Sequence, residues 1–182
     1  RLLPLGLLFL ALGCQGTPCP TPGNGPIAHF DTHALAGGSQ EDNWLSMPHP
    51  SDHRLTPDGQ IDWTDFPDPY RVDLLDDYLD ILGALDGYGL SAPIFIRFDS
   101  PLDTTAIPYQ PATTRRSGDA IQLIDISPDS PEYGQRRPLR WHWWADAQTY
   151  VPDNTLAIAP AWGFPLREST TYVLLLTKAL QG

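Results

Sequence analysis

The range Pro93–Asp103, PIFIRFDSPLD, constrains the fold of this chain more than any other stretch. Ile94, Ile96 and Phe98 fall on one side of a ribbon whose side chains alternate between two faces. Arg97 falls on the other side, so the pattern is typical of a β-strand with one buried face. A polar turn that contains a proline then ends the strand. The run therefore marks where a folded β domain begins, and nothing in it indicates an active site.

The chain after this run contains further strand-like segments separated by turns. Ile121–Ile126 is apolar enough to be buried on both faces, and Tyr172–Leu176 is a continuous apolar run suited to a central strand. Leu139–Trp144 alternates in character, and Leu156 and Ile158 alternate with small residues, as half-buried strands do. The chain also has 20 prolines, 15 glycines and six tryptophans, a composition that favours a loop-rich β protein over a helical bundle. We therefore expect a mainly β fold, an antiparallel β-sandwich.

A turn-rich adaptor at residues 43–91 precedes these strands and contains one helix. Asp68 is a suitable N-cap and Pro69 suits the first helical position, which predicts a helix over about residues 69–85. Gly87 is a natural stop. Four aspartates lie mainly on one side of this helix, without basic residues for i,i+4 pairs, so its stability depends on docking its apolar face. That face comprises Leu75, Tyr78, Leu79, Leu82 and Leu85.

The beginning of the chain has the pattern of an export signal. Arg1 gives a basic start, and the apolar stretch after it is too short to span a bilayer as a mature helix. The stretch ends in Ala11-Leu12-Gly13-Cys14, which resembles the lipobox cleaved by the lipoprotein signal peptidase. This resemblance implies a signal peptide at residues 1–13 and a diacylated Cys14, and two acyl chains give stable anchoring. Gln15, in place of Asp, resembles the pattern that permits sorting to the bacterial outer membrane.

Two alternatives stay open for this region. In one, the signal is a plain secretory signal and Cys14 is incidental. In the other, Cys14 pairs with Cys19, the only other cysteine, in a disulfide that excludes lipidation. In either case residues 14–42 are rich in proline and glycine, which predicts an extended tether. The first residue is not methionine, so we also expect the sequence to be a fragment.

A further resemblance covers residues 92–182. The segment LRESTTYVLL, residues 166–175, resembles the closing corner of immunoglobulin-like and fibronectin-type modules. There, a leucine precedes a threonine and a tyrosine, and the tyrosine buries its ring and hydrogen-bonds back across the corner. With the segments at 94–103 and 154–160, the order resembles the bacterial Ig-like domain common in surface lipoproteins. The resemblance implies an Ig-like β-sandwich that lacks its last strand, with a core strand left partly uncovered.

The adaptor has a resemblance of its own, over residues 47–88. Pro48-His49-Pro50-Ser51-Asp52, then Asp58-Gly59, then Ala84-Leu85-Asp86-Gly87-Tyr88 resemble the N-terminal region of certain secreted bacterial lipases. In those proteins this region leads into an Ig-like module, and the hydrolase domain follows. Gly89 stands where that pattern usually has a serine. The resemblance implies that a catalytic domain would lie beyond Gly182.

Catalytic and metal-binding patterns are weak in these 182 residues. Gly89-Leu90-Ser91-Ala92-Pro93 departs from the Gly-x-Ser-x-Gly elbow of serine hydrolases at its last position, so we do not expect Ser91 to be a nucleophile. His29, Asp31 and His33 alternate along one face and have the chemistry of zinc ligands, but we expect these residues, and His49 and His53, to be solvated surface groups. Asp58-Gly59-Gln60-Ile61-Asp62 resembles part of a calcium loop, yet Arg54 and Thr56 stand where oxygen ligands belong, so we expect a turn.

Trp141-His142-Trp143-Trp144 has the residue types of a carbohydrate-stacking platform. In an alternating strand Trp141 and Trp143 share the core face, so only His142 and Trp144 would face outward. We therefore expect core packing for the first pair and leave a glycan ligand as the alternative.

The charge balance, 22 Asp and Glu against 11 Lys and Arg, opposes binding to nucleic acid. The expectation is a noncatalytic surface lipoprotein region without a cofactor, attached to the bacterial outer membrane or cell surface through Cys14. It would act as a spacer or as an interaction module for a surface protein or glycan. The alternative is the N-terminal accessory region of a larger secreted esterase or lipase.

Overall fold

The computed structural model describes residues 25–31, 41–64 and 66–180 of the chain. This part is mainly β-strands in antiparallel sheets, with one α-helix, as the sequence predicts. The elements are α1 (Asp73–Gly83), β1 (Ile94–Arg97), β2 (Ile121–Asp125), β3 (Leu139–Trp144), β4 (Thr155–Pro160) and β5 (Tyr172–Leu176). All five strands coincide with the segments that the sequence marks, because each joins an apolar pattern to flanking turn residues.

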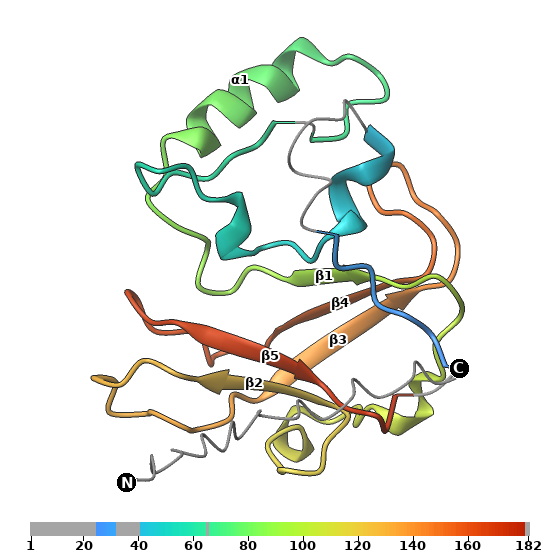
Figure 1. Ribbon diagram of the computed structural model, residues 1–182, viewed down its shortest axis with the longest axis vertical. Coiled ribbons are helices and arrows are strands. Elements are labelled where there is room, and N and C mark those ends of the chain that lie inside the picture. The colour runs from blue at the N-terminus through green and yellow to red at the C-terminus, as the bar shows by residue number, and fades with distance from the viewer. Residues whose placement is uncertain (1–24, 32–40, 65, 181–182) are drawn as a thin grey trace, which may run out of the picture.

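The strands form two sheets, one in the order β1-β4-β3 and the other of β2 and β5. In the first sheet Ile94 lies opposite Ile158, and Ile158 lies opposite Trp141. In the second, Leu123 lies opposite Leu174. Figure 1 shows the β2–β5 sheet on one side of the three-stranded sheet and α1 on the opposite side. Other segments of the adaptor lie between α1 and β1.

Side chains from both sheets form one hydrophobic core. Strand β4 is buried at all six positions because β1 and β3 flank it. Its small residue Ala157 lies opposite Phe95 of β1 and His142 of β3, which explains why a small side chain suits this position. Burial of each large apolar side chain contributes about 1.5–3 kcal/mol to the stability of the fold. The buried members of the core are Ile96, Phe98, Leu102, Ile107, Ala120, Ile121, Leu123, Leu139, Leu156 and Ile158.

Strand β5 does not occupy the central position that its apolar run suggests. Within the described residues it pairs with β2 alone. Leu174 and Leu176 pack against the core, whereas Leu175 points away from it and is exposed. An apolar run indicates which faces of a strand are buried and not which of its edges are paired, so it does not by itself place β5 between two neighbours.

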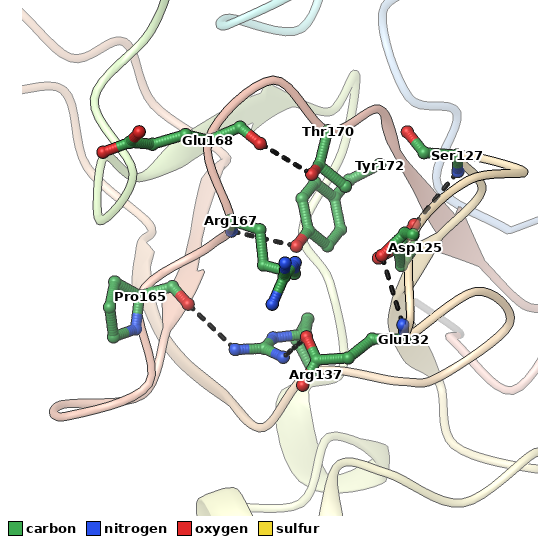
Figure 2. Close-up of polar contacts among 10 residues, drawn as sticks. Asp125, Ser127, Glu132, Arg137, Pro165, Arg167, Glu168, Thr170 and Tyr172 are labelled. Atoms are coloured by element: carbon green, nitrogen blue, oxygen red, sulfur yellow. Dashed lines mark hydrogen bonds and ion pairs between the residues drawn. The ribbon is translucent and has the colours of Figure 1, made fainter.

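A tyrosine fixes the corner that leads into β5, as the resemblance to Ig-like modules implies. The backbone N–H of Arg167 donates to the Tyr172 hydroxyl over 3.0 Å, and Tyr172 packs against the core (Figure 2). The Thr170 hydroxyl donates to the Glu168 carbonyl over 2.8 Å. Ser169, between them, adopts a φ of 49°, a left-handed conformation that these bonds hold in place.

A second set of polar contacts joins this corner to the loop between β2 and β3. Arg137 pairs with Glu132 at 2.7 Å and also donates to the Pro165 carbonyl over 2.8 Å (Figure 2). Buried Asp125 accepts hydrogen bonds from the Ser127 N–H and the Ser130 hydroxyl, so its carboxylate is satisfied inside the protein. The contacts tie together two segments about thirty residues apart in the chain, as expected for a rigid corner.

The N-terminal part of the described chain pairs with the edge of β1 that lies opposite β4. Ala28 bridges to Phe98, and the N–H of His29 donates to the Arg97 carbonyl over 2.8 Å. Further along, His49 and Phe95 exchange two backbone hydrogen bonds, of 3.1 and 2.7 Å. Unpaired strand edges promote aggregation, and these bridges close this one.

The helix is shorter than predicted. It begins at Asp73, where Val72 is the N-cap without a side-chain bond, and it ends at Gly83 rather than near Gly87. The Asp68 carboxylate instead accepts from the Val72 N–H over 2.8 Å and closes a separate turn. Arg71 has a φ of 49°, which interrupts any helix that starts at Pro69.

We predict that Tyr172→Phe lowers the free energy of unfolding by about 1 kcal/mol. The substitution leaves the ring in the core and removes only the hydroxyl that accepts from Arg167. Urea unfolding monitored by tryptophan fluorescence measures the change. Tyr109→Phe is the matched control because Tyr109 is exposed, and it should leave stability unchanged. An equal effect of both substitutions would contradict a structural role for the Tyr172 hydroxyl.

Candidate functional site

The structure brings together few of the residues that the sequence marks as candidate ligands. Cys14, the predicted lipidation site, and Cys19 and His33 lie outside the described residues. His29 is held by its backbone beside β1. In the ranges that the structure describes, no three His, Cys, Asp or Glu side chains gather in a way that could hold a metal ion.

Two other sequence candidates lie in turns. Gly59 has a φ of 81°, and its N–H donates to the Thr56 carbonyl over 2.9 Å in a small hairpin where Leu55 bridges to Ile61. The segment around Asp58 is thus the turn that its sequence predicts. Ser91 is exposed in the turn before β1, and the neighbouring Ala92 N–H donates to the Gly89 carbonyl.

The tryptophans of β3 divide between two faces as predicted. Trp141 and Trp143 pack against the core, and the Trp141 indole N–H donates to the Pro108 carbonyl over 2.9 Å. On the other face, Trp144 stacks on Phe95 with ring centroids 6.1 Å apart, and exposed His142 meets it edge-on at 4.4 Å. Because Phe95 covers part of one face of the Trp144 indole, this indole is half-buried rather than a free stacking platform.

A cluster of aromatic side chains, which sequence reasoning missed, connects the adaptor to β1. We call it the aromatic cluster. Trp44 stacks on Trp63 at 5.8 Å, and His49 lies 5.2–5.3 Å from both rings. The Arg54 guanidinium lies 3.7 Å above Trp44 and donates to its carbonyl over 2.7 Å. The cluster comprises Trp44, His49, Trp63, Phe66 and Tyr88.

His49 was expected to be a solvated surface group, and this expectation is wrong. Burial among the aromatic rings, and secondarily the positive charge of Arg54, lowers the pKa of His49 from 6.5 to about 4. Its buried Nδ1 has no hydrogen-bond partner among the described residues, so no hydrogen bond at this nitrogen stabilises the doubly protonated ring. His49 is therefore neutral at pH 7 and acts as an aromatic packing residue. The density of Trp, His and Phe between residues 44 and 66 was the signal that could have revealed this cluster.

The most exposed apolar surface on a regular element lies on α1. Leu74, Tyr78 and Ile81 recur at positions i, i+4 and i+7 and so share one helical face, and Leu85 follows two residues beyond the end of the helix at Gly83. Their exposed fractions are 58%, 56%, 64% and 44%, which are high for such large side chains. We call these four residues the helix stripe. The apolar face whose docking is expected to stabilise the helix is covered only in part, since Tyr78 and Leu85 belong to this exposed stripe.

A different face of α1 attaches the helix to the protein. Leu75, Leu79 and Leu82 are half-buried, and no residue of the helix is fully buried. At its C-terminal end, a Cβ added to Gly83 would meet the Trp63 indole at 4.0 Å, which places this end of the helix against the aromatic cluster. The apolar arc of α1 is thus wider than the surface that the adaptor covers.

Comparisons with known proteins identify no relative from which a function could be transferred. No protein-family model matches this chain, and neither does any curated protein or solved structure. Among the described residues, no helix combines the length and apolar character needed to cross a bilayer. The surfaces that can be argued from geometry are therefore the aromatic cluster and the helix stripe.

We predict that His49 makes the fold sensitive to acid. Because the folded pKa, about 4, lies below the unfolded value of 6.5, the unfolded chain binds a proton first as the pH falls. The contribution of neutral His49 to the free energy of unfolding is fully present above pH 6.5. It declines by up to roughly 3 kcal/mol between pH 6.5 and 4.

Urea unfolding as a function of pH tests this prediction. The variant His49→Gln should lose less stability than the wild type between pH 6.5 and 4, whatever its stability at pH 7. His53→Gln, which removes a nearby exposed histidine, should retain the wild-type slope. Parallel profiles of wild type and His49→Gln would show that His49 is not the acid-sensitive group.

Proposed function

We propose that this chain is the noncatalytic, lipid-anchored region of a bacterial surface lipoprotein, and that its folded part is a spacer that carries an interaction surface. The single observation that carries the interaction role is the exposed helix stripe. Leu74, Tyr78 and Ile81 are exposed on one face of α1, with exposed Leu85 just beyond its end, and adjacent large apolar side chains of this kind are typical of a surface that binds a partner.

The spacer role is supported by the way in which the described chain begins. Ile27 exchanges hydrogen bonds with Asp99, since its N–H donates to the Asp99 carboxylate over 2.8 Å and its carbonyl accepts from the Asp99 N–H over 3.1 Å. The first of these bonds is the main reason that the pKa of Asp99 is lowered. Force applied through a tether on the N-terminal side would therefore reach the edge of β1 within a few residues.

Within this proposal, residues 92–182 are an Ig-like β-sandwich that lacks its last strand. The two antiparallel sheets with one core support the sandwich, and the hydrogen bond from Arg167 to the Tyr172 hydroxyl supports the Ig-like type. The pairing of β5 with β2 alone in the described residues agrees with an uncovered edge.

A second candidate is the accessory N-terminal region of a secreted esterase or lipase. The specific observation in its favour is that two separate parts of the lipase-like pattern meet in space. The Tyr88 hydroxyl donates to the Ser51 carbonyl over 2.8 Å, and the rings of His49 and Tyr88 lie edge to face at 5.6 Å. An α/β pattern with a nucleophile elbow in the gene beyond Gly182 would favour this candidate.

Metabolic labelling with a fatty-acid analogue tests the anchor. We expect the wild type to be labelled and to fractionate with the outer membrane, and Cys14→Ala to lose both properties because the acyl chains need this thiol. Cys19→Ala is the matched control, since it removes the only other cysteine and should remain labelled. Retention of the label in Cys14→Ala, or an unlabelled wild type, would overturn the proposed lipid anchor.

A further inference from the structure

The surface of α1 is divided into three stripes with the same spacing. The helix stripe is exposed, and the half-buried leucines Leu75, Leu79 and Leu82 lie beside it. The third stripe consists of Asp73, Asp76, Asp77 and Asp80. At 100° per residue the centres of the stripes are separated by roughly 100–145° around the helix axis. The exposed stripe is therefore bordered by the attached face on one side and by four carboxylates on the other.

From this arrangement we propose that the helix stripe docks an amphipathic helix of a partner protein whose apolar face is bordered by lysine or arginine. The inference rests on the proposed role as an interaction module and specifies the chemistry of the partner. From Leu74 to Ile81 the stripe extends over roughly 10 Å at 1.5 Å per residue, which matches about two turns of a partner helix. Apolar contact along the stripe provides binding energy, and the carboxylates select a basic border.

The carboxylates of α1 have no basic counterpart on the helix itself. The helix contains no Lys or Arg, and Asp76 and Asp80 repel each other at i,i+4 spacing. Asp73 and Asp76 in the first turn are favoured by the helix dipole, but Asp77 and Asp80 lie beyond it. A basic partner would relieve this repulsion, so the charge pattern is complementary to a cationic helix.

The aspartates of α1 also argue against two other binding partners for the helix stripe. A second copy of the chain would bring four further aspartates to the interface and no basic residue from α1, on a molecule that already has a net charge of −11. A membrane surface is disfavoured because helices that lie in the interface carry basic polar faces, whereas the polar face of α1 is acidic. A cationic protein helix satisfies both the apolar stripe and its acidic border.

Fluorescence anisotropy with a labelled leucine–lysine helix of about 18 residues tests the proposal on the whole 182-residue chain. We expect this peptide to bind, and to bind more weakly as salt is added. Leu74→Gln and Ile81→Gln should each weaken binding by about tenfold or more, since both side chains are more than half exposed and lie in the stripe. Phe164→Gln, at an apolar residue of similar exposure off the helix, is the matched control and should not change affinity.

Two comparison peptides separate the apolar and charge requirements. A leucine–glutamate peptide with the same apolar face, and a lysine–glutamine peptide without one, should each bind at least about tenfold more weakly than the leucine–lysine peptide. Circular dichroism and urea midpoints equal to those of the wild type confirm that the glutamine variants fold, as expected for exposed positions.

Several outcomes would overturn the proposal. These are equal binding of the leucine–glutamate peptide, equal binding by Ile81→Gln and wild type, and no binding of the leucine–lysine peptide. If the wild type dimerises in sedimentation velocity and Ile81→Gln does not, the stripe binds a second copy of the chain. If the wild type floats with phosphatidylethanolamine–phosphatidylglycerol vesicles and Ile81→Gln does not, the stripe binds lipid. Labelling at Cys14 is independent of all these results, so failure here leaves the anchored spacer intact.

Discussion

The architecture of this protein depends on the pairing of both edges of β1. One edge pairs with β4 along its whole length, and the other receives the reciprocal backbone bonds of His49 and the bridge from Ala28. A short strand of four residues is marginal by itself, so these partners on both sides decide whether it forms. Through β1, the three-stranded sheet, the adaptor and the first described residues become one connected structure.

The backbone bond at His49 requires the aromatic cluster to form around its side chain. The ring enters a layer of Trp44, Trp63 and Tyr88, where an ionised imidazole would be costly and unpartnered. Arg54 is retained in the same layer because its guanidinium stacks on Trp44 and donates to a carbonyl. The adaptor is thus held by ring contacts together with the buried side chains of Leu45, Met47 and Ile61, and α1 lies on its outer side with Gly83 near Trp63.

This arrangement explains why α1 is open on one side. The adaptor supports one face of the helix, at the half-buried leucines, and leaves the helix stripe exposed among the residues that the structure describes. An apolar arc wider than its support is therefore presented to solvent beside four carboxylates.

The amino-acid sequence by itself determined the strands, since alternation and turn residues are local properties that β1 to β5 display clearly. It also determined the corner tyrosine and the turn at Gly59, because each depends on neighbours within a few residues. Only the tertiary structure decided that His49 is half-buried among aromatic rings and neutral, and that Arg71 delays the helix. The exposed helix stripe belongs to this second group. Periodicity shows that a helix face is apolar, but whether that face is covered depends on contacts between residues far apart in the chain.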